Sequence, residues 1–540
     1  MLKILIVLLA VGFTNSAAYA SLGNPDAQQG GTFVYNLDAE PTTLNPLTST
    51  DLYSRNVQAF IVEGLLERNV DDYGWEPRLA EKWDISKDGK IFTFTLREGL
   101  TFHDGKPVTT EDVKFSFDAI FDDKLPTAHL RPYYENIEKA EIVDPRVIKF
   151  YAKTLYFQNF DVVAELTVLP KHIYNDPSNK KLNKEMYGTG PYKIASYDKG
   201  TKLTLEKNQA WWGTKAGLKV DKGRFNFAKL VFKFVKEENV QIEMLKKGEL
   251  DYLEMRSETF MKKTEGPEWG TKVQKVKAEN IAPKSYGFVG FNMRRPVFTD
   301  KKVRVALTHL FNRQLIIDKF LYGMSMLATG PWYQQSEYAS KKAKPIPFDP
   351  KKGLALLKEA GWDDTDKDGV LDKTIDGKKT DFKFTLMTAN SDTMKYFTIF
   401  KEDAKKVGVD IEIKLLEWNT FIKLVDERSF DAIAMGWSAV VNPDPKQIWH
   451  SSSDTASGSN FVGYRNPEVD KLIDEARAAM DKKKRIPLLQ KVYEKIADDA
   501  PYIFLFNPKF IFYGNTAKMQ KPKDTLNYAV GTEYWWTPVK

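Results

Sequence analysis

The chain has 540 residues, and its 80 Lys and Arg residues against 73 Asp and Glu residues give a formal net charge of +7. Without a concentrated basic stripe, this charge disfavours a nucleic-acid-binding protein. The complete lack of cysteine excludes disulfides, thiolate metal sites, a cysteine nucleophile and a lipid anchor attached to cysteine. A chain of this length is expected to form two or three lobes rather than a single core.

The first twenty residues have the pattern of a signal peptide. Lys3 supplies a positive start, residues 4–13 are apolar, and the small-x-small triplet 18–20 precedes Ser21. The alternative is a membrane anchor, but this apolar run is shorter than the roughly 20 residues that a spanning helix needs. We therefore expect cleavage after Ala20 and an exported, soluble chain.

The early chain is predicted to alternate strand, loop and helix. Residues 32–37 read as a strand, residues 40–46 as a proline-containing loop and residues 54–65 as a helix. The later block 188–192 (GTGPY) resembles a phosphate loop only superficially. No Gly-Lys-Ser/Thr follows it, and Pro191 removes an N–H that a phosphate cradle would use, so we interpret the block as a turn.

The segment 83–120 carries the most detailed local signals. Residues 91–96 (IFTFTL) alternate bulky and hydroxyl side chains, as a strand with one buried face does. Asp-Gly pairs before and after this strand predict tight turns. Thr109, three residues before Asp112, predicts a capping box at the start of a helix whose apolar stripe includes Val113 and Phe117.

The second half of the chain alternates helical and strand patterns, which predicts an α/β domain. Helices are predicted at residues 240–247, 300–320, 350–360, 392–407, 468–480 and 486–497. Strands are predicted at residues 285–291, 382–386, 409–415 and 502–506.

Several blocks, in the same order along the chain, resemble the periplasmic solute-binding proteins of family 5, which serve ABC importers of peptides and nickel. The blocks are residues 77–120, GTGPYKI at 188–194, FVGFNMRRPVFTDKKVRVAL at 288–307, FDPKKGLALLKEAGW at 348–362, MGWS at 435–438 and NPEVDKLIDEA at 466–476. They extend over some 480 residues, so the resemblance covers most of the chain.

The resemblance implies an α/β clamp of three lobes, with mixed sheets flanked by helices and a β-rich insert domain. Lobe I would comprise residues 21–65, 185–284 and 506–540, lobe II residues 66–184, and lobe III residues 285–505. Such proteins close around a ligand held between lobes I and III by a hinge motion. The resemblance further implies a monomer in the periplasm that delivers a small peptide or other solute to an inner-membrane ABC permease.

The loop that follows Gly436-Trp437 is the main candidate for ligand contact. In the peptide binders of this family, a Trp at this position lines the cleft and an Asp four residues after the Gly pairs with the ligand's amino terminus. Here that position is Val440, and Asp444 lies further along the loop. We expect Trp437 and Asp444 to contact ligand, with core packing as the alternative for Trp437 and a turn role beside proline as the alternative for Asp444.

Four further residues are weaker candidates on the same resemblance. Phe288 lies at the proposed crossing between lobes, and Trp418 follows the strand 409–415. Asn45 lies in the loop after the first strand and is otherwise a turn former, and Asn507 follows the second crossing.

No metal or cofactor is predicted. Residues 364–369 (DTDKDG) imitate the start of a calcium loop, but the twelfth position is Ile375 where the bidentate ligand must be Glu, so an acidic turn is favoured and weak calcium binding stays open. The five histidines form no HExxH or other close pair. They are His103, His129, His172, His309 and His450.

Other classes of function are disfavoured. An enzyme such as a secreted hydrolase would need a nucleophile elbow, a metal pair or an acid/base constellation, and the sequence contains no GxSxG, HExxH or Cys–His arrangement. A structural or adhesive protein would usually show repeats. Within the binding class, oligopeptides or dipeptides are favoured, and Val440 leaves oligosaccharides, modified peptides and metal chelates open.

Overall fold

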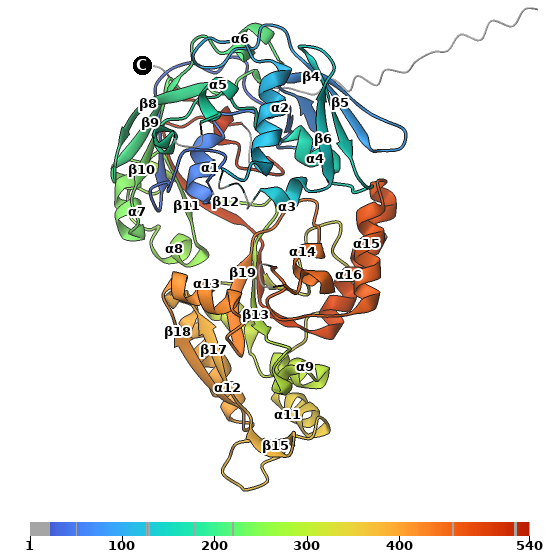
Figure 1. Cartoon of the computed structure of the whole chain (residues 1–540). Helices are drawn as coiled ribbons and strands as arrows, with labels where there is room; N and C mark the ends of the chain where they lie inside the picture. Colours follow the sequence, from blue (N-terminus) through green and yellow to red (C-terminus); the bar gives the residue numbers. More distant parts are fainter. Residues whose placement is uncertain are drawn as a thin grey trace, which may run out of the picture.

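The computed structural model describes residues 22–49, 51–125, 127, 130–176, 179–218, 221–455, 458–522 and 526–538. The predicted signal peptide and His129 therefore lie outside the described residues. Figure 1 shows two bodies, one above the other. We call residues 22–284 with 511–538 the upper body and residues 285–508 the lower body. The chain passes from one to the other between β12 and β13 and again between β21 and β22.

The upper body contains a four-stranded sheet in the order β1-β10-β9-β8, a three-stranded sheet β11-β22-β12, a second four-stranded sheet β4-β5-β7-β6 and the hairpin β2-β3. All neighbours pair antiparallel except β1 and β10, which are parallel. The strands are β1 (Thr32–Leu37), β2 (Leu66–Arg68), β3 (Trp75–Pro77), β4 (Ala80–Ile85), β5 (Ile91–Leu96), β6 (Ile137–Ile142), β7 (Val147–Ala152), β8 (Tyr192–Asp198), β9 (Lys202–Lys207), β10 (Lys229–Phe234), β11 (Tyr252–Met255), β12 (Val273–Ala278) and β22 (Ile511–Thr516).

The lower body is built on a five-stranded mixed sheet in the order β18-β17-β19-β13-β20, and the pairs β14-β21 and β15-β16 lie beside it. β17 is parallel to both of its neighbours, whereas β13 is antiparallel to β19 and β20. The strands are β13 (Tyr286–Phe291), β14 (Ser325–Leu327), β15 (Asp372–Ile375), β16 (Lys378–Asp381), β17 (Lys383–Thr388), β18 (Asp410–Leu415), β19 (Ala432–Trp437), β20 (Tyr502–Phe504) and β21 (Phe506–Pro508).

Helices cover these sheets. In the upper body they are α1 (Leu52–Gln58), α2 (Thr110–Asp118), α3 (Arg131–Tyr134), α4 (Asn159–Ala164), α5 (Lys171–Tyr174), α6 (Trp212–Ala216), α7 (Glu238–Lys246) and α8 (Ser257–Lys262). In the lower body they are α9 (Lys301–His309), α10 (Arg313–Lys319), α11 (Pro350–Glu359), α12 (Met394–Lys405), α13 (Trp418–Asp426), α14 (Lys446–Trp449), α15 (Pro467–Ala478) and α16 (Lys482–Asp499). Within the described part, no helix combines the length and apolarity that a membrane span requires.

The local predictions for the segment 83–120 are confirmed. In β5, Phe92, Phe94 and Leu96 are buried and the intervening residues are not, as the alternating pattern requires. At the start of α2, the Thr109 backbone N–H donates to Asp112 Oδ2 at 3.0 Å, and the reciprocal bond of the capping box is also present.

Two helix predictions are wrong in extent. The predicted helix 54–65 ends at Gln58, because the carbonyls of Phe60 and Ile61 accept hydrogen bonds from Tyr192 and Gly190 instead of continuing the helix. The predicted helix 300–320 is divided into α9 and α10. The side chain of Asn312 accepts a hydrogen bond from the Leu315 N–H and so starts a new helix. The predicted strand 502–506 is divided at Leu505 into β20, which pairs with β13, and β21, which pairs with β14. The strand 32–37 occurs as predicted, and the other predicted elements occur with most of their ends displaced, most strongly at α16.

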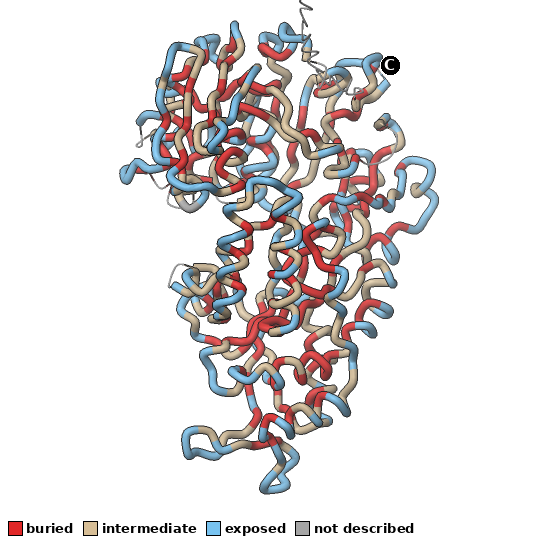
Figure 2. Tube along the Cα trace, turned by 90° about the vertical axis from the view of Figure 1, so that its right-hand side faces the viewer, coloured by how far each residue is buried: buried red, intermediate tan, exposed pale blue. Residues whose placement is uncertain are grey.

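Each cluster of fully buried apolar residues falls within one body. The largest cluster of the upper body joins strands of separate sheets, from Phe33 in β1 to Phe94 in β5. In the lower body, β13 separates two clusters: Val289 and Phe291 face one, and Phe288 faces the other. Figure 2 shows buried segments inside both bodies and exposed loops at the lower tip. The bodies are therefore separately packed units.

A buried charge network joins the β-rich part of the upper body to the rest of it. The Arg78 side chain, 3% exposed, pairs with Glu63 at 2.7 Å, Asp221 at 2.9 Å and Glu67 at 3.2 Å. Trp212 Nε1 donates to Glu63 at 2.8 Å. Burial raises the pKa of Glu63, so its carboxylate depends on these partners to stay ionised.

Arg78→Met should lower the free energy of unfolding by about 3–5 kcal/mol, because it leaves the buried carboxylate of Glu63 without its cation, whereas Arg224 still pairs with Glu67 and Asp221. Lys114→Ala is the matched control. It removes a cation from the exposed pair Lys114–Asp118 and should cost at most about 0.5 kcal/mol. Urea unfolding of both variants measures the difference, and equal losses would contradict a stabilising role for the network.

Candidate ligand-binding cleft

Two cavities lie where the upper and lower bodies face each other. The larger, with a volume of about 1010 Å³, is walled by β1, α1 and β11 of the upper body, and Ser391 and Asp392 of the lower body close one side. The smaller, of about 530 Å³, lies between α8 and α12. Residues of both bodies thus surround a common space.

Ion pairs connect the bodies at the rim of these cavities. Arg256 pairs with Asp392, and Lys395 Nζ lies 2.9 Å from Glu258 Oε2. Hydrogen bonds from Lys262 and Lys395 lower the pKa of Glu258. The stabilisation from this pair is complete above the ordinary carboxyl pKa and is lost as the pH falls through the lowered one.

A further bridge connects the loop after β7 to the lower body. Tyr156 Oη donates to Asp444 Oδ2 at 2.8 Å, and Gln158 Nε2 donates to the Asn442 carbonyl at 2.9 Å. Arg477 forms an ion pair with Asp444 and lies over the Tyr156 ring at 4.0 Å. The carboxylate of Asp444, which we predicted as a ligand contact, is therefore engaged by protein groups in this arrangement.

Trp437 is part of an aromatic stack at the end of β19. Its ring is stacked on Phe461 at 5.7 Å with an interplanar angle of 6°, and on Phe288 at 6.2 Å and 13°. Phe288 is in turn stacked on Tyr502 at 3.9 Å. Phe288 is fully buried, whereas Trp437 is half-buried, so Trp437 is the accessible end of this pair.

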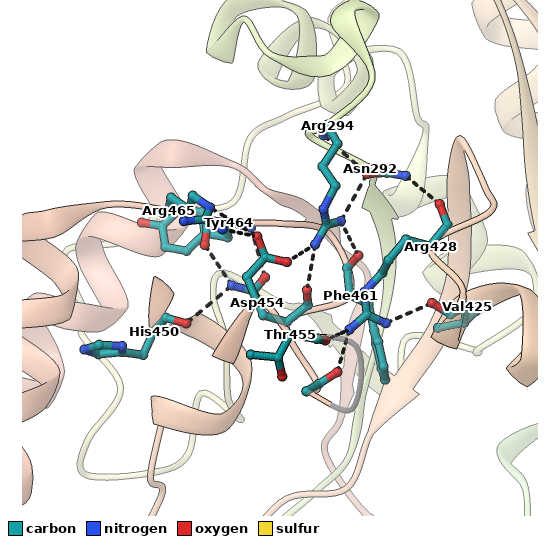
Figure 3. Close-up of polar contacts among 12 residues, drawn as sticks. Asn292, Arg294, Val425, Arg428, His450, Asp454, Thr455, Phe461, Tyr464 and Arg465 are labelled. Carbon is teal, nitrogen blue, oxygen red and sulfur yellow. Dashed lines mark hydrogen bonds and ion pairs between the residues drawn. The ribbon is translucent and has the colours of Figure 1, made fainter. Parts of the chain in front are cut away.

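Two arginines contact Phe461, the residue stacked on Trp437; Figure 3 shows Arg294, Arg428 and Phe461. Arg294 Nη1 donates to the Phe461 carbonyl at 2.9 Å, and the Arg428 guanidinium lies 5.1 Å from the centre of the Phe461 ring. Arg294 also pairs with Asp454, which Arg465 approaches to 2.7 Å. Burial raises the pKa of Asp454, but these hydrogen bonds outweigh it and lower the pKa. Charged side chains thus hold Phe461, and through it the aromatic stack, in position.

The remaining predicted residues have separate surroundings. Trp418 begins α13, is 57% exposed and is stacked on Phe421 at 5.9 Å. Asn45 Oδ1 accepts from the Leu47 N–H at 3.0 Å, which is the geometry of a turn. Asn507 is buried in β21, and its Nδ2 has no partner among the described residues.

Of the six predicted contacts, the structure brings Phe288 and Trp437 together. None of the six lines either inter-body cavity. Val440 is 56% exposed.

The cavity walls contain residues that the sequence reasoning missed, above all Tyr35, Asp38, Tyr252 and Glu254. For Tyr252 and Glu254 the sequence did contain a signal, the alternation of residues in the strand β11 (YLEM). Leu253 and Met255 are buried, so Tyr252 and Glu254 share the opposite face of an edge strand.

The calcium-like segment forms an acidic turn at the lower tip. Carboxylate oxygens of Asp364, Asp366 and Asp372 lie within 4.8 Å of one another. The Lys379 ammonium pairs with Asp366 and lies 3.6 Å from Asp372, so it supplies the positive charge that such a cluster needs.

Separately packed bodies, joined by two chain crossings and facing each other across shared cavities, define a clamp-type solute-binding protein. The chain belongs to the bacterial extracellular solute-binding proteins, family 5, whose family model, described as "Bacterial extracellular solute-binding proteins, family 5 Middle", matches residues 74–459. The family resemblance and the α/β binding-protein fold predicted from the sequence are thereby confirmed.

Known proteins resemble the chain over nearly its whole length. The oligopeptide-binding protein AppA of Bacillus subtilis (strain 168) is 30% identical over 514 residues, covering 92% of this chain and 89% of that protein. The structure of AppA from Bacillus subtilis in complex with a nonapeptide has a TM-score of 0.77 at 27% identity and covers 95% of this chain and all of that one. NikZ from Campylobacter jejuni in complex with Ni(L-His) shares the fold, with a TM-score of 0.76 at 24% identity, 94% of this chain and 99% of that one.

Tyr156→Phe should favour separation of the two bodies, because it removes a hydrogen bond to the half-buried carboxylate of Asp444 worth about 1 kcal/mol, or roughly a fivefold change in population. The chain has no native cysteine, so spin labels can be attached to Lys199→Cys and Lys378→Cys, which replace exposed residues of the upper and lower bodies. The label-to-label distances of the ligand-free variant should include a longer population than those of the parent.

The matched control for that measurement is Tyr133→Phe, which removes the hydroxyl of an exposed tyrosine in the upper body. It should leave the distances unchanged. Identical distance distributions for Tyr156→Phe and the parent would contradict a role for the bridge in holding the bodies together.

Proposed function

We propose that this protein is the solute-binding component of an ABC importer and that its ligands are oligopeptides or dipeptides. The observation that carries the proposal is the cleft itself, a cavity of about 1010 Å³ bounded by both bodies of a family 5 chain. The similarity to AppA, an oligopeptide-binding protein, supports a peptide as the ligand.

The proposed mechanism is closure about the two chain crossings, without covalent chemistry. In the described part of the chain, no cluster of buried apolar residues has members in both bodies, so closing and opening mainly exchange polar bridges. An apolar contact also joins the bodies, because Met324 of the lower body packs against a cluster of the upper body. A ligand that contacts both bodies favours the closed state by its differential affinity. In this proposal lobe III corresponds to the lower body.

Lobes I and II together correspond to the upper body, and they should move as one unit because the largest buried cluster contains residues of both. The lobe boundaries are those expected from the family. β21, at the start of the expected third segment of lobe I, pairs with β14 of the lower body. We therefore place the second hinge after Pro508.

For the ligand contacts, the half-buried ring of Trp437 is the favoured surface, since Phe461 and Phe288 hold it in place. Asp444 can contact a ligand only in exchange for Tyr156 or Arg477. Phe288 would support Trp437 from beneath, and Trp418, Asn45 and Asn507 stay predictions. The competing proposal is a non-peptide solute such as an oligosaccharide or metal chelate, which the exposed Val440 favours at the position of the family's amine anchor.

We further propose that the protein is exported to the periplasm, functions as a monomer and delivers its ligand to a membrane permease. The mass of the mature protein recovered from the exporting cell tests the first step. It should correspond to a chain that begins at Ser21, as cleavage after Ala20 predicts. A mass that includes the first twenty residues would contradict cleavage.

Thermal-shift screening against mixtures of dipeptides and oligopeptides tests the ligand class. A ligand present at 100 times its Kd stabilises the native state by about 2.7 kcal/mol, which raises the melting temperature. Peptides should produce this shift, and a lower radius of gyration in solution scattering should accompany it. Mass spectrometry of molecules that copurify would identify the natural ligand.

Oligosaccharides and nickel–histidine are the comparison ligands in that screen. A shift produced by one of them and by no peptide would contradict peptide binding. An unchanged radius of gyration with a bound ligand would contradict closure, and turnover of the ligand would favour an enzyme.

A further inference from the structure

The larger cavity has an excess of negative charge once its ion pairs are taken into account. Its charged residues are Asp38, Glu237, Glu238, Glu254 and Asp392, with Lys236, Arg256 and Lys263. Arg256 pairs with Asp392, and Lys263 Nζ lies 3.3 Å from Glu238. Three carboxylates therefore face the cavity against the single ammonium of Lys236.

Glu254 is the most exceptional of these carboxylates. It lines both cavities, from the face of β11 that it shares with Tyr252. Its carboxylate has no hydrogen bond or ion pair with any described residue. The side chain is accessible to solvent through the cavity, yet the protein atoms around it desolvate the carboxylate and raise its pKa. A cation that entered the cavity would supply the partner that the protein does not.

Asp38 places a second negative charge on the same wall. Its Oδ1 accepts from Asn36 Nδ2 and from Gln241 Nε2, both at 3.0 Å. These donors are neutral amides, so they fix the orientation of the carboxylate and leave its charge uncompensated. Burial and the charges of Asp38 and Asp51 raise the pKa of Tyr53, as expected beside a negative surface.

Aromatic rings complete the lining of this wall. Tyr35 is stacked on Phe232, with 5.0 Å between ring centres and an interplanar angle of 10°. Tyr252 lies beside Tyr513 and Trp535 and also lines the cavity. Aromatic faces attract lysine, arginine and amino groups, and the attraction is stronger where water is excluded.

We propose that the wall formed by Tyr35, Asp38, Tyr252 and Glu254 is a subsite for a cationic group of the ligand, either a lysine or arginine side chain of a peptide or its amino terminus. This inference rests on the proposed function and specifies the substrate class: peptides that present a positive charge to the upper body. The alternative acceptor in the lower body, Asp444, is already paired with Arg477. Among the described residues, the carboxylates of Asp38 and Glu254 in the upper body thus have no cationic partner.

The test is calorimetric titration of the ligand-stripped, full-length mature protein with Ala-Lys-Ala-Ala, Ala-Glu-Ala-Ala and Ala-Ala-Ala-Ala. Each tetrapeptide is used with a free and with an acetylated amino terminus. The lysine peptide should bind about ten times more tightly than the glutamate peptide, since its ammonium forms a charge-assisted hydrogen bond with a carboxylate of the wall and the glutamate is repelled there. The preference should shrink as salt is raised.

Glu254→Gln removes the charge and keeps the shape, so it should abolish most of that tenfold preference and leave the affinity for acetylated Ala-Ala-Ala-Ala, which carries no positive charge, unchanged within about twofold. Asp38→Asn is the second variant and should reduce the preference in the same direction. The matched control is Glu265→Gln, an exposed change of the same kind that lines neither cavity and should alter nothing. Unchanged melting temperatures would show that the variants are folded.

The acetylated peptides distinguish the two sources of positive charge. If the lysine side chain occupies the subsite, acetylation leaves the effect of Glu254→Gln in place. If the amino terminus occupies it, acetylation abolishes that effect for all three peptides. Equal affinity of the parent for every tetrapeptide, with no effect of acetylation, would overturn the cationic subsite and leave peptide binding standing. Binding of none of them would overturn peptide binding and the subsite with it.

Discussion

Separate packing of two hydrophobic cores is the constraint on which the rest of this structure depends. Every cluster of fully buried apolar residues in the described chain belongs to one body, and no such cluster bridges the cleft. Apolar burial contributes most to stability, so each body is stable by itself and the orientation between them is left to weaker contacts. Without disulfides, the two crossings are the covalent connection. A hinge motion is expected because packing is strong within each body and weaker between the bodies.

Several contacts between the bodies are polar, while Met324 of the lower body packs against an apolar cluster of the upper body. Arg256 with Asp392, Lys395 with Glu258, and Tyr156 with Asp444 are ion pairs or hydrogen bonds that water can replace at modest cost. This contrasts with the network around Arg78, which is buried inside the upper body and holds its two parts together. Ion pairs therefore hold the bodies together weakly and the parts of the upper body strongly, because breaking an ion pair costs more free energy when its charges are buried.

The proposed ligand contacts come from both bodies, although Trp437 lines neither of the two inter-body cavities. In the lower body, the arginines around Phe461 hold the stack that ends at Trp437, while in the upper body an edge strand presents Tyr252 and Glu254. A ligand that spans both would be held by aromatic area on one side and charge on the other. Such a division makes binding sensitive to closure, since neither surface alone surrounds a ligand.

Local signals in the sequence determined much of this protein by themselves. The alternation in residues 91–96 and the capping box at Thr109 depend on neighbouring residues only, and ordered family blocks defined the fold class. The early end of α1 depended on tertiary hydrogen bonds, such as that from Gly190 to the Ile61 carbonyl. The division between α9 and α10 rests instead on a local cap, Asn312, which the sequence reading missed. Likewise, only the folded chain revealed that Asp444 is engaged by Tyr156, 288 residues away, and that the Glu254 carboxylate has no partner among the residues that the structure describes. Charge pairing across a cleft is a property of three-dimensional proximity, which residue spacing along the chain does not encode.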